Sequence, residues 1–381
     1  MIIQVDDTPT VEGFEKAVSK VLADKNVKGL FIISCDANGF TPEAVDPVLQ
    51  KAGVPVFGGI FPSMIYGNEK KEQGTIVVGL LKEVRVGVIK NLSDNDLDYV
   101  NSIDEQFPGI GSVKTMFVFV DGFAKRIDAF IGTLFTVFGL ENNYIGGGAG
   151  SMSLKQKPCL FTPQGLIQDG AVLALLDLHS GIGVSHGWEP IRGPFKVTES
   201  DRNRMKTLDW KPAFDLYKKV VEEHTQQRID EANFFDTAKA YPFGIAKIGA
   251  EGIVRDPLLV ETDHSLVCVG EVPEGSFVHI LKGDESSLIK AAANALLLSK
   301  EAFKYRADDS NPDSKLTIFI DCISRVLFLG ERFNEELNSV YQAGETQCLI
   351  GACTIGEIAN SGTDYLEFYN KTAVVAQLEE I

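Results

Sequence analysis

The chain lacks the short motifs with which cysteines and histidines hold metals or form redox disulfides. Its six cysteines are scattered without a Cys-x-x-Cys pair, and its five histidines include no His-Glu-x-x-His motif. In a chain of 381 residues, this scatter suits reduced and mostly buried thiols better than a disulfide framework. We therefore expect no metal site and no cofactor.

Long apolar runs and positive charge are also scarce. No apolar run approaches the roughly 18 residues that a membrane helix needs. The stretch from Met1 to Asp7 has neither the basic nor the apolar region of a signal peptide. With 53 acidic and 36 basic residues the net charge is -17, and no basic run is present, so phosphate backbones are disfavoured partners. We expect a cytoplasmic protein with no nucleic-acid partner and no membrane insertion.

Nucleotide and hydrolase motifs are missing as well. The run from Gly146 to Ser151 is rich in glycine but fits neither the GxGxxG nor the GxxxxGK[ST] spacing. No GxSxG motif occurs, and Ser151 and Ser153 follow the glycines without an identifiable base. The run instead predicts a tight strand exit at a packing interface or a loop that lines a ligand.

What the sequence does contain is a repeated unit of apolar strand, aspartate, helix, second strand, glycine cluster and third strand. Three copies span residues 30–80, 116–176 and 316–375. Their strands end at Asp36, Asp121 and Asp321, and their glycine clusters begin at Gly58, Gly146 and Gly351. A degenerate fourth copy is expected through residues 243–246 and 266–270. The pattern predicts an α/β protein of two similar α/β domains built from repeated strand-helix-strand-strand units, with mixed sheets and helices on the outer faces.

The length and the 44% content of hydrophobic residues exceed one typical core and favour two domains. The best boundary follows the polar stretch 199–204 and precedes a helix opened by Pro212, since proline is tolerated in the first turn. We therefore predict domains at residues 1–208 and 209–381.

Polar residues gather at strand ends in the closing copy, which predicts a binding site there. A guanidinium suits a carboxylate and a carboxylate suits an ammonium group, so Arg325 and Glu357 together indicate an amino-acid-like ligand. The alternative is that these two side chains simply pair with each other. The candidate ligand-binding residues are Cys322, Arg325, Gly351, Thr354, Glu357 and Asn370, joined by Gly146 and Gly147 of the second copy.

Two other functions stay open. Cys322 could be a catalytic nucleophile if a helix N-terminus or Arg325 favours its thiolate, although a buried structural thiol is the stronger interpretation because no base can be identified. The apolar segment from Ile60 to Tyr66 could serve an interaction scaffold as an exposed loop, or it could pack inside the protein.

In these residues the chain resembles the FIST family (F-box and intracellular signal transduction) over nearly its whole length. Residues from about 25 to 208 resemble its N-terminal domain and the remainder resembles its C-terminal domain. The motifs are Phe57-Gly58-Gly59, Ile145 to Gly150, His186-Gly187-Trp188, Cys322-x-x-Arg325, Gly351 to Glu357 and Asn370-x-Thr372. The resemblance implies an intracellular sensory module that binds a small ligand, such as an amino acid or a derivative, and is coupled to signalling domains.

The chain departs from this family in two respects. Its first cluster reads Gly58-Gly59-Ile60-Phe61-Pro62, where many relatives carry a polar run of the Gly-Cys-Thr-x-Gly-Glu type. No kinase, cyclase or F-box segment is present, so the resemblance implies an output through a separate signalling protein.

Overall fold

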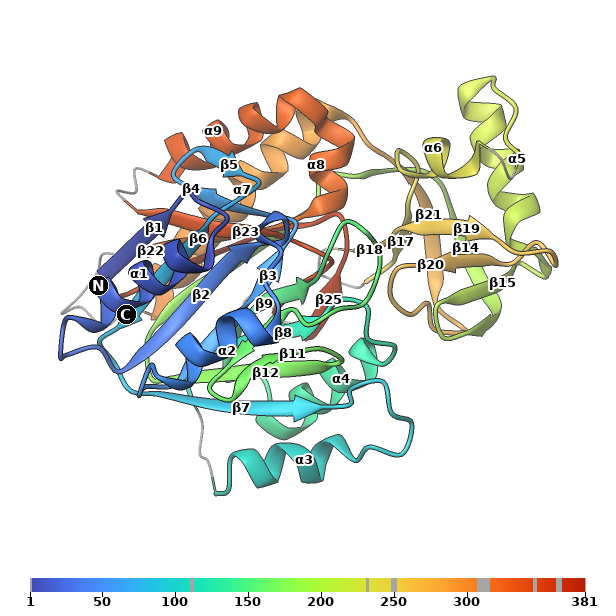
Figure 1. Cartoon of the computed structure of the whole chain (residues 1–381). Coiled ribbons are helices and arrows are strands. Elements are labelled where there is room, and N and C mark those ends of the chain that lie inside the picture. The colour runs from blue at the N-terminus through green and yellow to red at the C-terminus, as the bar shows by residue number, and fades with distance from the viewer. Residues whose placement is uncertain are drawn as a thin grey trace.

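The computed structural model describes residues 2–109, 113–230, 233–247, 252–306, 316–344, 348–360 and 365–380. In this part of the chain, three six-stranded sheets pack together, and an eight-stranded sheet lies to one side of them (Figure 1). Helices lie outside the three sheets. The predicted mixed α/β class, with its mixed sheets and outer helices, is confirmed.

Each six-stranded sheet is built on one copy of the predicted repeat. The first two strands of a copy pair in parallel, and the third strand pairs with the first in the antiparallel direction. These strands are β2 (Gly29–Cys35), β3 (Val56–Phe61) and β6 (Thr75–Leu80); β8 (Thr115–Asp121), β9 (Asn143–Ala149) and β12 (Gly170–Leu176); and β22 (Leu316–Cys322), β23 (Leu349–Thr354) and β26 (Ala373–Leu378). All nine are buried along their length, which explains why they read as continuous apolar runs.

The helices begin where local signals place them. The Thr10 side chain accepts the backbone N–H of Gly13 at the start of one helix, and Pro42 occupies the first turn of another. The helices that cover the sheets are α1 (Val11–Leu22), α2 (Pro42–Gln50), α3 (Tyr99–Gln106), α4 (Ile127–Phe138), α7 (Glu285–Arg306), α8 (Ile323–Leu329) and α9 (Phe333–Gly344). Within the described residues, none of the helices has the length and apolar character that a membrane crossing requires.

The three copies exchange strands in a cycle. A hairpin after each second strand joins the sheet of another copy: β4 (Ser63–Tyr66) and β5 (Glu69–Lys71) join β23, β10 (Leu160–Thr162) and β11 (Gly165–Ile167) join β3, and β24 (Glu357–Asn360) and β25 (Leu366–Tyr369) join β9. In the first two copies, the strand that follows the third strand also joins another sheet: β7 (Val84–Lys90) pairs with β12, and β13 (Ser180–Ser185) pairs with β26. β1 (Ile2–Asp6) completes the first sheet beside β6. No sequence signal predicted this exchange.

The first glycine of each cluster has one structural role in all three copies. A Cβ atom at Gly58, Gly146 or Gly351 would collide with the backbone carbonyl of the residue opposite it on the parallel neighbour strand. The register beyond these glycines makes Cys35, Asp121 and Cys322 equivalent strand ends, because these residues face Phe61, Ala149 and Thr354 respectively. The predicted equivalence of Asp36 and Asp321 with Asp121 is therefore wrong by one residue in each case.

Residues 189–282 form the eight-stranded sheet, which is antiparallel throughout its described strands. Its strands are β14 (Glu189–Asp201), β15 (Arg204–Leu208), β16 (Lys211–Pro212), β17 (Phe243–Ile245), β18 (Ile253–Arg255), β19 (Pro257–Val260), β20 (Leu266–Cys268) and β21 (Phe277–Lys282), with α5 (Ala213–Thr225) and α6 (Phe234–Ala238) beside them. The predicted fourth copy is wrong, because its two strands are β17 and β20 of this antiparallel sheet. The boundary at residue 208 stays a prediction, and it falls between β15 and β16, which pair with each other.

Most of the apolar segment from Ile60 to Tyr66 is packed inside the protein, and only Tyr66 at its end is exposed. Ile60 and Phe61 are buried in β3, and Met64 and Ile65 are buried in β4, whose partner is β23. Of the two alternatives for this segment, packing inside the protein therefore holds for its residues up to Ile65, because the crossing to β23 buries them.

Candidate functional site

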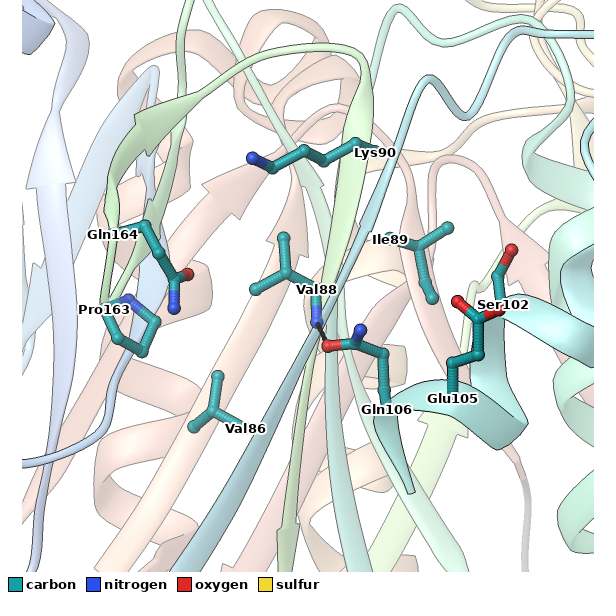
Figure 2. A pocket seen from close by; sticks show the side chains of 9 residues that line it. All are labelled: Val86, Val88, Ile89, Lys90, Ser102, Glu105, Gln106, Pro163 and Gln164. Atoms are coloured by element: carbon teal, nitrogen blue, oxygen red, sulfur yellow. Dashed lines mark hydrogen bonds between the residues drawn. The ribbon is translucent and has the colours of Figure 1, made fainter. Parts of the chain in front are cut away.

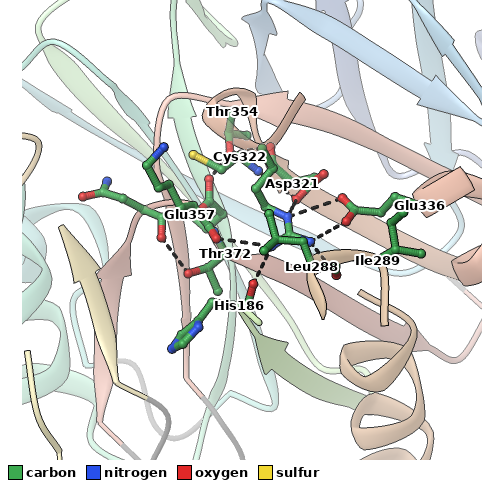
Figure 3. Close-up of polar contacts among 12 residues, drawn as sticks. His186, Leu288, Ile289, Asp321, Cys322, Glu336, Thr354, Glu357 and Thr372 are labelled. Atoms are coloured by element: carbon green, nitrogen blue, oxygen red, sulfur yellow. Dashed lines mark hydrogen bonds and ion pairs between the residues drawn. The ribbon is translucent and has the colours of Figure 1, made fainter. Parts of the chain in front are cut away.

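A cluster of buried polar side chains lies where β22 and β23 end and β24 begins (Figure 3). Cys322 ends β22, Thr354 ends β23, Glu357 begins β24, and Asn370 lies in the turn between β25 and β26. Because β22 and β23 are parallel, their carboxyl ends meet at one edge of the sheet. The structure thus brings four of the predicted site residues to the same place.

The Glu357 carboxyl is at the centre of this cluster and has no exposed surface. One of its oxygens accepts the Thr354 hydroxyl at 3.0 Å, and the other accepts the backbone N–H of Thr372 at 3.2 Å. Burial raises the pKa of Glu357 to about 8, against the opposing effect of hydrogen bonds from Cys322, Thr354 and Thr372. The carboxyl can therefore hold a proton near neutral pH and release it to bind a cationic group.

This carboxyl has no counterpart in the other two copies. Glu357 pairs with Gly147 in the register of its hairpin, and the equivalent hairpin residues are Met64 and Leu160. Both are buried apolar side chains. Since the scaffold is built twice with an apolar residue here, strand packing alone does not require an acid in the third copy.

Cys322 occupies a position that suits an anion but is deeply buried. The backbone N–H groups of Ser324 and Lys371 point to its sulfur, and at the equivalent strand end the Asp121 carboxylate accepts the corresponding two backbone N–H groups at 3.0 and 2.7 Å. Burial, followed by the charge of Glu357, raises the pKa of the Cys322 thiol well above its usual value. A nucleophile needs the thiolate, so this geometry does not support the alternative of catalysis by Cys322.

Arg325 lies on α8 and is the largest side chain with no exposed surface. Its guanidinium forms ion pairs with Asp321, at 3.0 Å, and with Glu336. It also donates to the carbonyls of His186 and Leu288 at 2.7 and 2.9 Å. These contacts tie α8 to α7, α9 and the end of β22 (Figure 3). The ligand role of Arg325 stays a prediction, and in this conformation a ligand carboxylate would have to displace Asp321 or Glu336.

The sequence interpretation missed two buried charges beside the cluster. The Lys371 ammonium lies 3.1 Å from the Asp256 carboxylate, donates to the carbonyl of Lys239 at 2.9 Å, and lies 5.0 Å from the centre of the Trp188 ring. Lysine is rarely buried completely without a partner. Asn370-x-Thr372 was the only sequence signal near Lys371. No signal marked Asp256, which lies between β18 and β19 of the eight-stranded sheet.

Three acceptor atoms near the cluster lack a hydrogen-bond partner within the described part of the chain, and one of them is Asp321 Oδ2. Asn370 donates its amide to the carbonyl of Tyr369 at 2.9 Å, while its Oδ1 is buried without a hydrogen-bond partner. The Oδ1 atom of Asp256 is in the same situation. Buried acceptors without partners are uncommon and are expected where a polar group of a ligand can be bound.

The predicted glycines bring strands together around the cluster. A Cβ atom at Gly147 would lie 2.7 Å from the carbonyl oxygen of Gly356 and 2.9 Å from the Thr354 side chain. Gly146 and Gly351 allow the close strand pairs described above. Their contact with a ligand stays a prediction. Among the described residues, no group of three or more His, Cys, Asp or Glu side chains is placed to hold a metal ion.

Comparison with known proteins finds two adjacent domain matches. Residues 29–211 match the FIST N domain, and residues 213–360 match the FIST C domain. The chain is also similar to an uncharacterized protein of Methanocaldococcus jannaschii, with 26% identity over 222 residues, which is 51% of this chain and 40% of the relative. The matching segment thus spans about two fifths of the length of that relative.

Proposed function

Because the chain belongs to the FIST family, whose domains are generally sensory and signal-transduction domains, we propose that it is a cytoplasmic sensor of a small amino-acid-like molecule. The ligand site is the cluster of Cys322, Thr354, Glu357 and Asn370. The output passes to a separate signalling protein.

The observation that carries this proposal is the buried carboxyl of Glu357. It occupies a position where the two other copies have Met64 and Leu160, and burying it costs free energy that the apolar residues avoid. A buried carboxyl with this free-energy cost is expected to be retained where it binds a ligand. The unpaired Oδ1 of Asn370 supports the same assignment.

The chemistry of these groups favours an ammonium as the recognised group. An ammonium donates up to three hydrogen bonds, and the Glu357 carboxylate and the Asn370 oxygen are acceptors. Since Glu357 holds a proton near neutral pH, binding a cation there releases a proton. A carboxylate on the same ligand would be bound by Arg325 in exchange for one of its two protein carboxylates.

A ligand at this site would act on the ion pair of Lys371 with Asp256, which connects the cluster to the eight-stranded sheet. Asn370 is adjacent to Lys371, whose ammonium binds Asp256, and Asp256 also accepts the Ser324 hydroxyl at 3.1 Å. Movement of the turn from Asn370 to Thr372 would therefore change the ion pair that holds the eight-stranded sheet against the three packed sheets. We propose this contact as the route from ligand to output.

The test is a thermal-shift screen of amino acids and related amines, followed by calorimetry of a hit with the unmodified chain and with Glu357→Gln. The loss of a charge-assisted hydrogen bond should cost about 1.5 to 3 kcal/mol, roughly a 10- to 150-fold weaker affinity. Calorimetry in buffers of different ionisation enthalpy should show proton release with the unmodified chain near pH 7 and none with the variant.

The matched control is Glu367→Gln, which removes a carboxylate from β25 of the same hairpin, where it pairs with Lys247 at the surface. Its affinity for the hit should be unchanged. A hit that binds Glu357→Gln as tightly as the unmodified chain would show that the ligand lies elsewhere, and a screen without any hit would count against a sensor of this ligand class.

A further inference from the structure

A groove runs along the open edge of the second sheet and shares no residue with the Glu357 cluster (Figure 2). Its volume is about 390 Å³. The edge strand is β7, which pairs with β12 on one side only. The groove is lined by Val86, Val88 and Lys90 of β7, by Glu105 and Gln106 of α3, and by Gln164 in the turn between β10 and β11.

The backbone of β7 offers hydrogen-bonding groups to this groove. The Val88 N–H donates to the side-chain carbonyl of Gln106 at 3.0 Å, so it points away from β12. In contrast, a Cβ atom at Gly170 of β12 would lie 2.6 Å from the Ile89 carbonyl oxygen, so that carbonyl points toward β12. In an antiparallel pair the two orientations alternate along the strand. The N–H and C=O groups of Val86 and Lys90 therefore also face the groove.

The side chains around this edge suit an extended peptide. Val86 and Val88 are only partly buried and give the groove an apolar floor. Lys90 and Glu105 are exposed, and neither forms an ion pair with another described residue. Figure 2 shows α3 on one side of β7 and the turn with Pro163 and Gln164 on the other. An isolated strand could enter between these walls.

We propose that this groove binds an extended segment of a partner protein, which joins the second sheet as an additional strand beside β7. The segment has apolar side chains over Val86 and Val88 and an acidic residue that pairs with Lys90. In the free protein, Gln106 supplies the acceptor that a carbonyl of the segment replaces. The site is independent of ligand binding at Glu357.

A partner segment fits better than a second copy of this chain. The β7 strand of a second copy would be flanked by its own α3 and its own hairpin turn, and both would meet the walls of the first groove. A paired β7 would also bring the basic residues Arg85 and Lys90 of two copies together. An isolated peptide strand has no flanking helix or turn, and it need not bring further basic residues to this edge.

The probe is a library of random heptapeptides displayed on phage, selected on the full chain, with affinities of the enriched synthetic peptides measured by fluorescence anisotropy. Val86→Pro removes one N–H that faces the groove and spares the pairing with β12, since proline is tolerated on an edge strand when its nitrogen faces outward. We expect enriched peptides with an acidic position to bind this variant at least about tenfold more weakly.

Two further variants keep the test decisive if Val86→Pro folds poorly. Lys90→Glu should weaken the acidic peptides about fivefold and should be compensated by peptides with lysine at that position. Gln106→Ala should strengthen binding about 2- to 10-fold, because the peptide no longer competes with the Gln106 side chain. Arg85→Gln is the control on the same strand, because the backbone groups of Arg85 face β12, and it should leave the affinity unchanged.

Three results would overturn the proposal. The first is that no peptide is enriched, and the second is that enriched peptides bind both Val86→Pro and Lys90→Glu as well as they bind the unmodified chain. The third is sedimentation evidence of a dimer that Val86→Pro dissociates, which would assign this edge to a second copy.

Discussion

At the scale of single residues, the Glu357 carboxyl shows how burial changes the chemistry of an ordinary side chain. Its pKa in the folded state is about 8, compared with 4.5 for an unperturbed glutamate. Below pH 4.5 both the folded and the unfolded states hold the proton. Between these two pKa values only the folded state keeps it, so the free energy of unfolding falls as the pH rises through this window. Above pH 8 this contribution is constant.

We therefore predict that Glu357→Gln reduces the pH dependence of stability between about pH 5 and 8. The variant should gain stability relative to the unmodified chain as the pH rises, measured by urea unfolding at several pH values. A smaller slope should remain, because burial also raises the pKa values of Asp321 and Asp256. Glu105→Gln, at an exposed glutamate of α3, is the control and should keep the full slope. Equal slopes for Glu357→Gln and the unmodified chain would contradict the buried-acid interpretation.

At the scale of elements, the three copies show that one backbone arrangement tolerates different strand ends. Cys35, Asp121 and Cys322 occupy the same place in their sheets, whereas Gly58, Gly146 and Gly351 are the same residue type in each copy. The glycines are restricted because a neighbouring carbonyl occupies the space of a side chain. The strand ends carry a thiol in two copies and a carboxylate in the third, and backbone N–H groups are hydrogen-bonded to Asp121 and to Cys322 alike.

We predict that Gly351→Ala destabilises the protein by about 3 kcal/mol or more, because a methyl group would force the β22 and β23 backbones apart. Gly132→Ala is the matched control, since Gly132 lies on the exposed face of α4 with no atom in the way. That variant should be more stable by up to about 1 kcal/mol. Chemical unfolding of both variants tests the prediction, and a Gly351→Ala protein as stable as the unmodified chain would refute the steric argument.

At the scale of the whole molecule, the cyclic exchange of strands makes the three sheets depend on one another. The second sheet contains β24 and β25 from the C-terminal part of the chain, and the third sheet contains β4, β5 and β13 from the N-terminal part. Without these strands, the pairing edges of β9, β23 and β26 would be exposed. The two family domains are therefore adjacent in sequence but interleaved in space.

We predict that residues 1–208 and 209–381 do not fold when expressed separately, and that co-expression of the two fragments restores a folded complex. Each fragment alone should lack a cooperative unfolding transition and a dispersed NMR spectrum, while the complex should show both. A single fragment that unfolds cooperatively would mean that the exchanged strands are dispensable.

The sequence alone was sufficient for features that depend on neighbouring residues. The repeat copy predicted at residues 116–176 contains β8, α4, β9 and β12 in the predicted order of strand, helix, strand and strand. The three repeat copies also followed from the sequence, and so did the meeting of Cys322 with Thr354, because parallel strands bring their carboxyl ends together.

Only the tertiary structure decided which groups these residues meet. Arg325 binds Asp321 and Glu336 instead of Glu357, and Lys371 meets Asp256 more than one hundred residues away in the chain. The three hairpins cross to other sheets without any signal in their own residues. The physical reason is that periodicity and turn chemistry act over a few residues, whereas ion pairs, burial and sheet exchange depend on segments that are brought together only when the whole chain has folded.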